Sequence, residues 1–482
     1  MKFYITTAIG YINAPPHIGH ALEYVQADVI ARYHRLIGNQ VFFLTGTDEN
    51  GSKAYETAKN QRISPQKLAD INSKKFSELD EGLAISHDYF IRTSDKKIHW
   101  PGVIKLWQKL AEAGDIYKDK YSGFYCVGCE AFLSQKELVD GKCSIHETKP
   151  KILSEVNYFF QLSKYQNVIQ RLIETDELKI MPKVRKNEIL KLISQGLPDV
   201  SFSRPASKLT WGIPVPGDPD QIIFVWGDAL TNYLTGAGFG RDEKSFQNLW
   251  PADLHIIGKD ILRFHAIYWP AMLLSAKLPL PKAIFVHGFI TFGGKKMSKS
   301  LGNIIDPFEL IKKNGSDAVR YYLLKEIPPT DDGDITFDKF KNVYNGELAN
   351  GLGNLVARVA TLCEKSGLEF APPKQTTATA YLFRRNAVGK LLEEFKFNQA
   401  LNYIWGKNSE TDKLINKERP WELLETKSQK PKAESLLQDL VDRVREIASL
   451  LSPFLPATSV KIQKQFQGPK IVSEKSLFPR FT

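Results

Sequence analysis

The chain has 482 residues, 43% of them hydrophobic and 25% charged, and a formal net charge of +11. This composition is typical of a globular protein with roughly two to four domains. No run of about 18 apolar residues occurs, and residues 1–7 lack the basic region and cleavage site of a secretory signal, so we expect a cytoplasmic protein with no membrane span. Four cysteines are too few for a disulfide framework.

Short β-branched or aromatic runs alternate with amphipathic stretches over the first half of the chain. The predicted elements, in chain order, are a strand at 2–7, a helix at 18–37 ended by Gly38, strands at 41–44, 222–226, 254–257 and 284–286, and helices after Gly227 and Asp260. This alternation predicts an α/β fold with a doubly wound parallel sheet of the Rossmann type. Ligands of such sheets bind at the carboxyl ends of the strands, where four candidates fall: Asp48, Trp226, Gly258 and His287.

Helical periodicity replaces the strands from about residue 340 onward, at 342–366, 379–407 and 433–451, and predicts a C-terminal α-helical bundle. Residues 341–482 hold 22 Lys and Arg against 15 Asp and Glu, a surplus of +7. Such a surplus is typical both of a polyanion-binding module and of a merely soluble basic surface. The predicted domains are an α/β domain in two halves (1–115 and 211–288), a connective insertion (116–210), a loop region (289–340) and the helical domain (341–482).

His17-Ile18-Gly19-His20 opens the first predicted helix. A helix N-terminus has unpaired N–H groups and a partial positive charge, so it suits a phosphate, and both histidines can add donors there. Gly19 has no side chain and lets a flat base approach the backbone. By itself, a histidine pair at a helix start is often only a cap or a surface feature.

A second motif, Lys296-Met297-Ser298-Lys299-Ser300, lies in a glycine-flanked loop. A loop of lysines and glycines is, by itself, more often a solvated turn. The two motifs together are the HIGH and KMSKS signatures, and in them the chain resembles the class I aminoacyl-tRNA synthetases. The resemblance implies that the chain activates an amino acid with ATP.

The expected reaction needs no general base, because an amino-acid carboxylate is already ionised at neutral pH and can attack the α-phosphorus directly. Alignment can supply roughly 7–11 kcal/mol, and fixed cations stabilise the departing pyrophosphate. We therefore expect His17, His20, Lys296 and Lys299 to be catalytic, with Mg²⁺ sharing the charge. The predicted ATP site consists of His17, Gly19, His20, Gly258, Asp260, Lys296, Met297, Ser298 and Lys299. Asp260 can either hold a ribose hydroxyl or cap the following helix, and both readings stay open.

Longer strings make the resemblance more specific. They are TTAIGYINAPPHIGHA, FFLTGTDENG, FVWGDALTNY, HIIGKDILRFHAIYWPAML and KMSKSLGN, which are similar to those of bacterial methionyl-tRNA synthetases. The resemblance implies a methionine pocket lined by Ala8, Ile9, Tyr11, Trp226, Ala229, Tyr233, Ile261 and His265, with Asp48 accepting the α-ammonium. A thioether suits aromatic and aliphatic walls, and Tyr11 or His265 can donate a weak hydrogen bond to its sulfur. The C-terminal dimerisation domain of many relatives is not found, so we expect a monomer.

The insertion contains Cys126-Val127-Gly128-Cys129 and Cys143-Ser144-Ile145-His146. The thiolates of Cys126, Cys129 and Cys143 and the imidazole of His146 have a spacing that can close tetrahedrally on one Zn²⁺. Four protein ligands leave no open coordination position, so we expect a structural zinc knuckle.

The helical domain is expected to read the anticodon. By the resemblance, Asn354 and Arg358 contact the anticodon from one helix face, and Trp421 stacks on one of its bases. Without the resemblance, a solvated Asn/Arg pair and a core tryptophan are the simpler interpretations.

The sequence therefore predicts a methionine–tRNA ligase, which forms methionyl-adenylate from methionine and ATP and transfers the methionyl group to the 3′-terminal ribose of initiator and elongator tRNA(Met). Two alternatives stay open: a class I synthetase of neighbouring specificity, such as cysteine, and a non-catalytic tRNA-binding paralogue. Amino-acid preference and zinc content distinguish the first, and intact HIGH, KMSKS and Asp48 disfavour the second.

Overall fold

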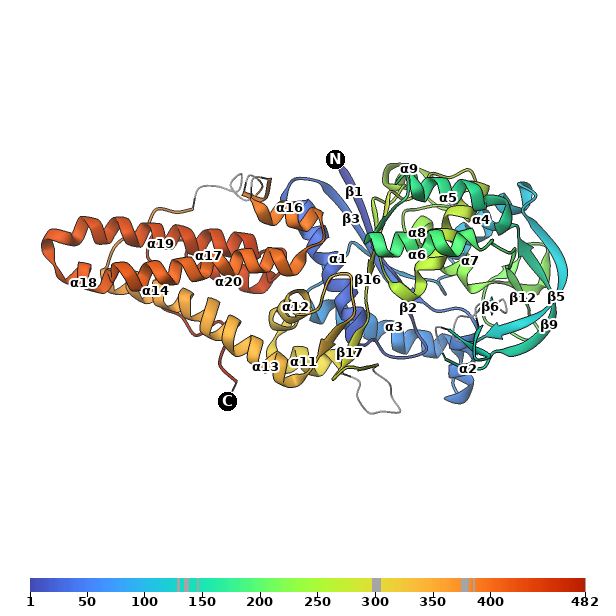
Figure 1. Cartoon of the computed structure of the whole chain (residues 1–482), viewed down its shortest axis with the longest axis horizontal. Helices are drawn as coiled ribbons and strands as arrows, with labels where there is room; N and C mark the ends of the chain where they lie inside the picture. Colours follow the sequence, from blue (N-terminus) through green and yellow to red (C-terminus); the bar gives the residue numbers. More distant parts are fainter. Residues whose placement is uncertain are drawn as a thin grey trace.

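The structure is a computed structural model that describes residues 1–127, 131–133, 138–144, 147–296, 305–373, 380, 382–384 and 386–481. The molecule is elongated, with an α/β region at one end and a bundle of long helices at the other (Figure 1). Within the described ranges, no helix is both long and apolar enough to cross a membrane.

Among the described residues, the central sheet has seven strands: β1 (Lys2–Thr7), β2 (Gly10–Tyr11), β3 (Gln40–Asp48), β4 (Tyr89–Arg92), β10 (Lys179–Met181), β15 (Leu254–Gly258) and β16 (Ala283–His287). Their order is β10-β16-β15-β1-β3-β2, with β4 also pairing with β3, and every pairing is parallel. The chain passes outward from β1 to β3 in one direction and from β15 to β16 in the other, with the earlier strand β10 at the edge beyond β16, so the topological switch point lies between β1 and β15. The predicted parallel α/β fold is confirmed.

Helix α1 (Ile18–Leu36) packs on β1, β3 and β15 and is buried along most of its length. The other helices of this region are α2 (Ser52–Asn60), α3 (Pro65–Gly82), α4 (Trp100–Glu112), α5 (Gln166–Glu174), α6 (Lys183–Ser194), α7 (Val225–Ala229), α8 (Asn232–Thr235), α9 (Glu243–Leu249) and α10 (Trp269–Ser275). Between β15 and α10 the chain forms one turn of 3-10 helix at Lys259–Ile261 and a π-helix at Phe264–Tyr268. Two large hydrophobic clusters cover opposite faces of the sheet, because successive side chains of β1 such as Tyr4 and Ile5 point to opposite sides.

The predicted strand at 222–226 is wrong in two respects. The strand there, β14 (Asp218–Ile223), belongs to a separate antiparallel sheet with β12 (Ser203–Pro205) and β13 (Pro214–Val215). Trp226 lies in α7 instead. A short apolar run reads alike as a buried strand or as a buried helix, so its periodicity could not separate the two.

The insertion is built on a sheet of β11 (Val200–Ser201), β9 (Lys151–Phe160), β5 (Ile116–Cys126) and β6 (Ala131–Leu133), with β7 (Leu138–Val139) pairing with β8 (Lys142–Cys143) beside it. Strands β5 and β9 lie at the end of the molecule opposite the bundle (Figure 1). Strand β10, inside the predicted range 116–210, pairs with β16 in the central sheet.

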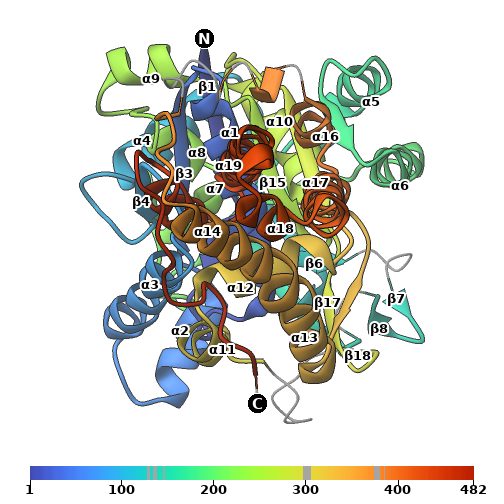
Figure 2. The same ribbon diagram turned by 90° about the vertical axis from the view of Figure 1, so that its left-hand side faces the viewer.

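Beyond β16, strand β17 (Ile290–Phe292) pairs with β18 (Lys295–Lys296) and with β19 (Gly333–Ile335). The helices that follow are α11 (Pro307–Asn314), α12 (Ser316–Lys325), α13 (Phe337–Val343), α14 (Asn354–Ser366), α16 (Ala387–Glu393), α17 (Phe397–Glu418), α18 (Pro420–Glu425), α19 (Lys430–Leu451) and α20 (Pro456–Gln465), with a π-helix at Tyr344–Gly353. From the bundle's end, α14, α17 and α19 stand in front of the central sheet (Figure 2). The predicted helical C-terminal region is confirmed, but the helix expected at 379–407 is interrupted, since Phe395 between α16 and α17 has a φ of +56°.

A fully buried guanidinium, that of Arg320 on α12, joins the two regions. It is ion-paired with Asp28 of α1 at 2.7 Å and donates to the carbonyl oxygens of Phe454, Pro453 and Leu83 at 2.7, 2.9 and 3.0 Å. Pro453 and Phe454 lie between α19 and α20, so one side chain links the first helix of the α/β region to the bundle.

Candidate active site

A cavity of about 490 Å³ opens at the carboxyl ends of β1, β3, β15 and β16. All the residues predicted to bind methionine line it: Ala8, Ile9, Tyr11, Asp48, Trp226, Ala229, Tyr233, Ile261 and His265. Five residues of the predicted ATP site line it as well: His17, Gly19, His20, Gly258 and Asp260. Since these residues come from segments far apart in the sequence, the fold brings both predicted subsites into one cavity at the switch point.

The remaining predicted ATP ligands are in the second motif. Lys296 ends β18, whereas Met297, Ser298 and Lys299 lie outside the described residues. The hairpin that leads to them is tied to β19 by Asp334, whose carboxylate accepts from the Gly294 N–H at 2.7 Å and from the Thr291 hydroxyl at 2.8 Å.

The two motif histidines cap α1. The Nδ1 atom of His17 accepts from the Gly19 N–H, and the Nδ1 atom of His20 accepts from the His17 N–H, both at 3.1 Å. An Nδ1 that accepts cannot carry the proton, so each ring presents its donor at Nε2. Burial, followed by the neighbouring His17 and His287 rings, lowers the pKa of His20 well below its ordinary value. The cap thus holds two neutral imidazole rings with fixed tautomers at the N-terminus of α1.

Tyr11 and Trp226 line the apolar part of the cavity, and Phe264, which is not among the lining residues, packs on Trp226. Trp226 stacks on Phe264 with centroids 3.5 Å apart, and Tyr11 meets Trp226 edge-on at 6.2 Å. Phe264 was not among the predicted residues, although its position within the predicted helix after Asp260 gave a signal for burial.

Tyr233 and His265 form a hydrogen-bonded pair in the same wall, with Oη and Nε2 2.8 Å apart. The Nδ1 atom of His265 lies 3.0 Å from the Ile261 carbonyl oxygen, which can only accept, so Nδ1 carries the proton. Nε2 therefore accepts from the Tyr233 hydroxyl, and burial lowers the pKa of His265 to about 4, which keeps the ring neutral. With this tautomer the Nε2 atom of His265 accepts, and the weak hydrogen bond to a substrate sulfur from Tyr11 or His265 stays a prediction.

Glu23, which the sequence did not single out, and His287, one of the four candidates at the strand ends, join α1 to the end of β16. Their Oε2 and Nε2 atoms are 2.9 Å apart, and the other oxygen of Glu23 accepts from the Ala8 N–H at 2.8 Å. Burial raises the pKa of Glu23; burial alone lowers that of His287, but the Glu23 carboxylate raises it above its ordinary value. The pair fixes the end of β1 relative to the first motif.

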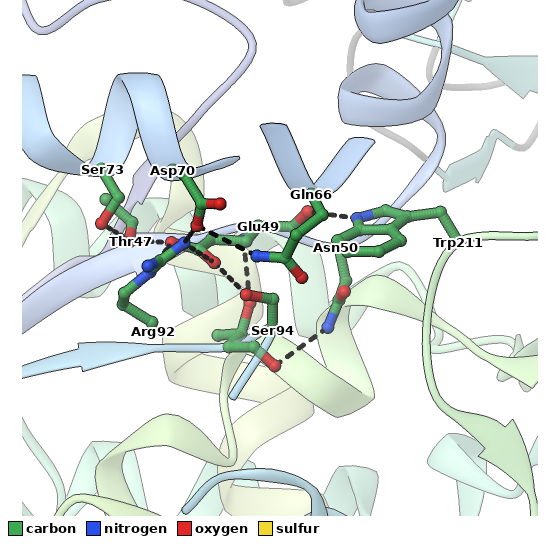
Figure 3. A network of polar contacts seen from close by, with 10 residues as sticks. Thr47, Glu49, Asn50, Gln66, Asp70, Ser73, Arg92, Ser94 and Trp211 are labelled. Atoms are coloured by element: carbon green, nitrogen blue, oxygen red, sulfur yellow. Dashed lines mark hydrogen bonds and ion pairs between the residues drawn. The ribbon is translucent and has the colours of Figure 1, made fainter. Parts of the chain in front are cut away.

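A second polar network holds the segment after Asp48 (Figure 3). The buried carboxylate of Glu49 accepts from Arg92 Nε at 2.7 Å, from the Thr47 hydroxyl at 2.8 Å and from the Ser94 hydroxyl. The Glu49 carbonyl oxygen accepts from the indole N–H of Trp211 at 2.6 Å. Asp48, only 2% exposed, is therefore followed by a backbone that is held from several sides.

Two of the predicted zinc ligands lie together. Cys126 at the end of β5 and Cys143 at the end of β8 are both buried in one small cluster with Leu133. Cys129 and His146 lie outside the described residues, and among the residues that are described no group of three or more potential metal ligands occurs. Two buried thiols with little apolar core around them fit a site for a thiophilic metal such as zinc.

The three predicted anticodon residues lie on the bundle. Asn354, at the start of α14, is exposed, and Trp421 on α18 is 39% exposed, unlike a core tryptophan. Arg358, one turn after Asn354, contacts Asp412 and donates from Nη2 to the Asn416 side chain at 2.8 Å. Two residues of α17 that the sequence did not reveal thus orient the guanidinium.

Comparisons with known proteins show the family of the chain. The sequence model of a family described as tRNA synthetases class I (M) matches residues 3–143 and 129–360. The methionine–tRNA ligase of Thermotoga maritima is 41% identical over 99% of this chain and 77% of its own length, and that of Rhizobium meliloti is 42% identical over 95% and 90%. The structure of Mycobacterium tuberculosis methionyl-tRNA synthetase in complex with methionyl-adenylate is 39% identical, with a TM-score of 0.92 over all of both chains. The chain belongs to the methionyl-tRNA synthetase family.

Proposed function

We propose that this chain ligates methionine to its cognate tRNA in two steps: formation of methionyl-adenylate with release of pyrophosphate, and transfer to the 3′-terminal ribose. The observation that carries the proposal is the single cavity at the switch point, lined by every residue predicted to bind methionine and by the histidines of the first motif. A carboxylate nucleophile and an α-phosphate held there need alignment and charge stabilisation, but no added base.

In the amino-acid subsite, Asp48 takes the α-ammonium, because a buried carboxylate is stabilised by a cation. Ala8, Ile9, Tyr11, Trp226, Ala229, Tyr233, Ile261 and His265 surround the thioether. The hydroxyl of Tyr233, oriented by His265, and the stacked ring of Trp226 define its far wall. These apolar walls disfavour charged side chains by desolvation.

In the nucleotide subsite, His17 and His20 donate from Nε2 to the triphosphate, and Gly19 admits the adenine. A Cβ at Gly258 would lie 2.8 Å from an Asp260 carboxylate oxygen, so the missing side chain leaves room for that carboxylate. We assign Asp260 to a ribose hydroxyl, and Lys296 and Lys299, with Met297 and Ser298 between them, to the pyrophosphate. Mg²⁺ would share the phosphate charge.

One structural Zn²⁺ would be held by Cys126, Cys129, Cys143 and His146. Its binding would stabilise the part of the insertion around β5 and β8 (the zinc lobe), which has little apolar core of its own. We expect the purified protein to contain about one zinc per chain, and a chelator to unfold the lobe first. Protein that folds and charges tRNA with no bound metal would contradict this assignment.

At the far end of the bundle, Asn354 and Arg358 would contact anticodon base edges, and Trp421 would stack on a base, which is worth about 1–3 kcal/mol. The exposed indole and the oriented guanidinium support this assignment. The expected RNA partners are initiator and elongator tRNA(Met).

The decisive experiment is amino-acid-dependent ATP–pyrophosphate exchange without tRNA, across all twenty amino acids. Exchange with methionine alone is expected. Exchange with cysteine or another amino acid would keep the synthetase and overturn the pocket, and no exchange from folded protein would leave a tRNA-binding paralogue.

A further inference from the structure

Behind the cavity wall, three buried side chains connect segments that are far apart in the sequence. Asn50 follows β3, His99 precedes α4, and Asp228 lies in α7; their exposed fractions are 3%, 0% and 1%. None of them lines the cavity. A buried carboxylate with polar neighbours on both sides needs an explanation, because its desolvation is costly unless each oxygen is hydrogen-bonded.

Asp228 is the centre of this bridge. One of its oxygens accepts from the Asn50 amide at 2.7 Å, and the other accepts from the Nε2 atom of His99 at 2.6 Å. The Nδ1 atom of His99 lies 2.8 Å from the Thr235 hydroxyl in α8, and the Asn50 amide also donates to the Thr93 carbonyl at 3.2 Å. A carboxylate only accepts, so both of its partners must present N–H groups, and the Asp228 bridge has one arrangement.

The Asp228 bridge lies next to both halves of the amino-acid subsite. Asn50 is two residues after Asp48, which faces the cavity. Asp228 lies between Trp226 and Ala229, which form the apolar wall. The hydrogen bond from Asn50 to Asp228 therefore fixes the separation between the carboxylate at one end of the subsite and the wall at the other.

We propose that Asn50, Asp228 and His99 are positioning residues that set the length of side chain the amino-acid subsite accepts. An α-amino acid carries its ammonium group and its side-chain terminus at a separation fixed by chain length. When a buried carboxylate bridge joins the two ends of the subsite, the distance between them is fixed and only a side chain of matching length fits. Without the bridge, the two ends of the subsite can move to accept longer or shorter side chains. This inference rests on the proposed function.

The segment that carries Asn50 is already rigid on its other side. Glu49 is held by Arg92 and by Ser94, and its carbonyl oxygen accepts from Trp211 (Figure 3). Helix α7, in contrast, is only five residues long and has no side-chain cap. The Asp228 bridge therefore holds α7 against a fixed support, so we expect its loss to move Trp226 and Ala229 rather than Asp48.

The test uses the full chain with Asn50→Ala and, separately, Asp228→Asn, which keeps the shape of the side chain. Asn157→Ala is the matched control, because Asn157 is also fully buried and donates to Ser201 at 3.0 Å, but lies on β9 away from the cavity. ATP–pyrophosphate exchange gives KM and kcat for methionine, the longer ethionine and ATP, and a thermal melt gives stability.

Both bridge variants should raise the KM for methionine about tenfold, since a shift of 1 Å can cost up to about 100-fold, and should lower the preference for methionine over ethionine. The KM for ATP should stay within about twofold of its original value, because the nucleotide subsite rests on Glu23 and His287. The control should lose comparable thermal stability without either change.

If the variants melt earlier but keep the KM for methionine and the preference over ethionine, the Asp228 bridge is purely structural and the inference fails. Equal rises in both KM values would also overturn it. If Asn50→Ala does not fold, Asp228→Asn decides alone, since it keeps the shape of the side chain and one acceptor oxygen while it removes the acceptor for one of the two neighbours. Absence of methionine-dependent exchange in the unsubstituted chain would instead refute the proposed function.

Discussion

Replacing Arg320 with methionine tests how the α/β region is joined to the bundle. The guanidinium is fully buried and contacts four groups, of which three are backbone carbonyl oxygens (Phe454, Pro453 and Leu83). Arg320→Met keeps much of the side-chain volume and removes every one of these donors. The fourth partner, Asp28, is less affected, because Arg32 and Ser86 still contact it.

The expected loss is about 3–5 kcal/mol, the usual cost of removing one partner from a buried ion pair. The carbonyl groups contribute to it, since each buried acceptor left without a donor costs about 1–3 kcal/mol unless water reaches it. The matched control is Arg443→Met, whose i,i+4 pair with Asp439 is exposed on α19. Such a surface pair is worth about 0.3–0.5 kcal/mol.

Hydrogen exchange of the backbone amides in α12 and at the α19–α20 junction measures the loss of stability locally. This avoids the assumption that a chain with several domains unfolds in a two-state transition. A loss of 3–5 kcal/mol should speed exchange there from roughly 100-fold to several thousand-fold, with little change in β5 and β9. Exchange no faster than in the control would refute the view that this guanidinium holds the two regions together.

The same variant has a pH signature. Burial by itself raises the pKa of Asp28, but the Arg320 and Arg32 guanidiniums and the Ser86 hydroxyl hold it below its ordinary value. A carboxyl whose folded pKa is depressed stabilises the fold above its unfolded pKa of about 3.9, and this contribution is lost as the pH falls through the folded value. The difference in unfolding free energy between the unsubstituted chain and Arg320→Met should therefore be largest at neutral pH and should become smaller below about pH 4. A gap that widens on acidification would contradict the pairing.

Three further substitutions test the assigned sites. Tyr233→Phe removes the hydroxyl that donates to His265 and should weaken methionine binding by about 1–2 kcal/mol. In exchange assays the KM for methionine should rise while the KM for ATP stays unchanged. Equal rises in both KM values would exclude a role for this hydroxyl in the amino-acid subsite. Asp412→Ala releases the Arg358 guanidinium and should raise the KM for tRNA several-fold while exchange without tRNA is unaffected, and unchanged charging at limiting tRNA would rule this out. Trp421→Ala should weaken charging by about 1–3 kcal/mol in kcat/KM for tRNA and spare exchange; a parallel loss of exchange would point to misfolding instead.

Strong local signals allowed several elements to be predicted closely. Strand β1 has the predicted bounds, 2–7, and α1 begins at the predicted residue, because the apolar run and the histidine cap are encoded within a few residues. The run at 222–226 and the interruption at Phe395 were missed, since the first pattern fits two conformations and the second depends on how α16 and α17 pack against their neighbours.

The sequence by itself determined the class of reaction and, through its resemblance to a family, the amino acid and the residues around it. Only the tertiary structure decided how those residues are held. Glu23 is hydrogen-bonded to His287, which lies 264 residues later in the sequence, and Asn50 to Asp228, which lies 178 residues later. The physical reason is that a buried carboxylate must have hydrogen-bond donors, but any part of the chain that the fold brings near can supply them. A motif names the groups that touch a substrate, whereas the partners that orient those groups are selected by packing in three dimensions.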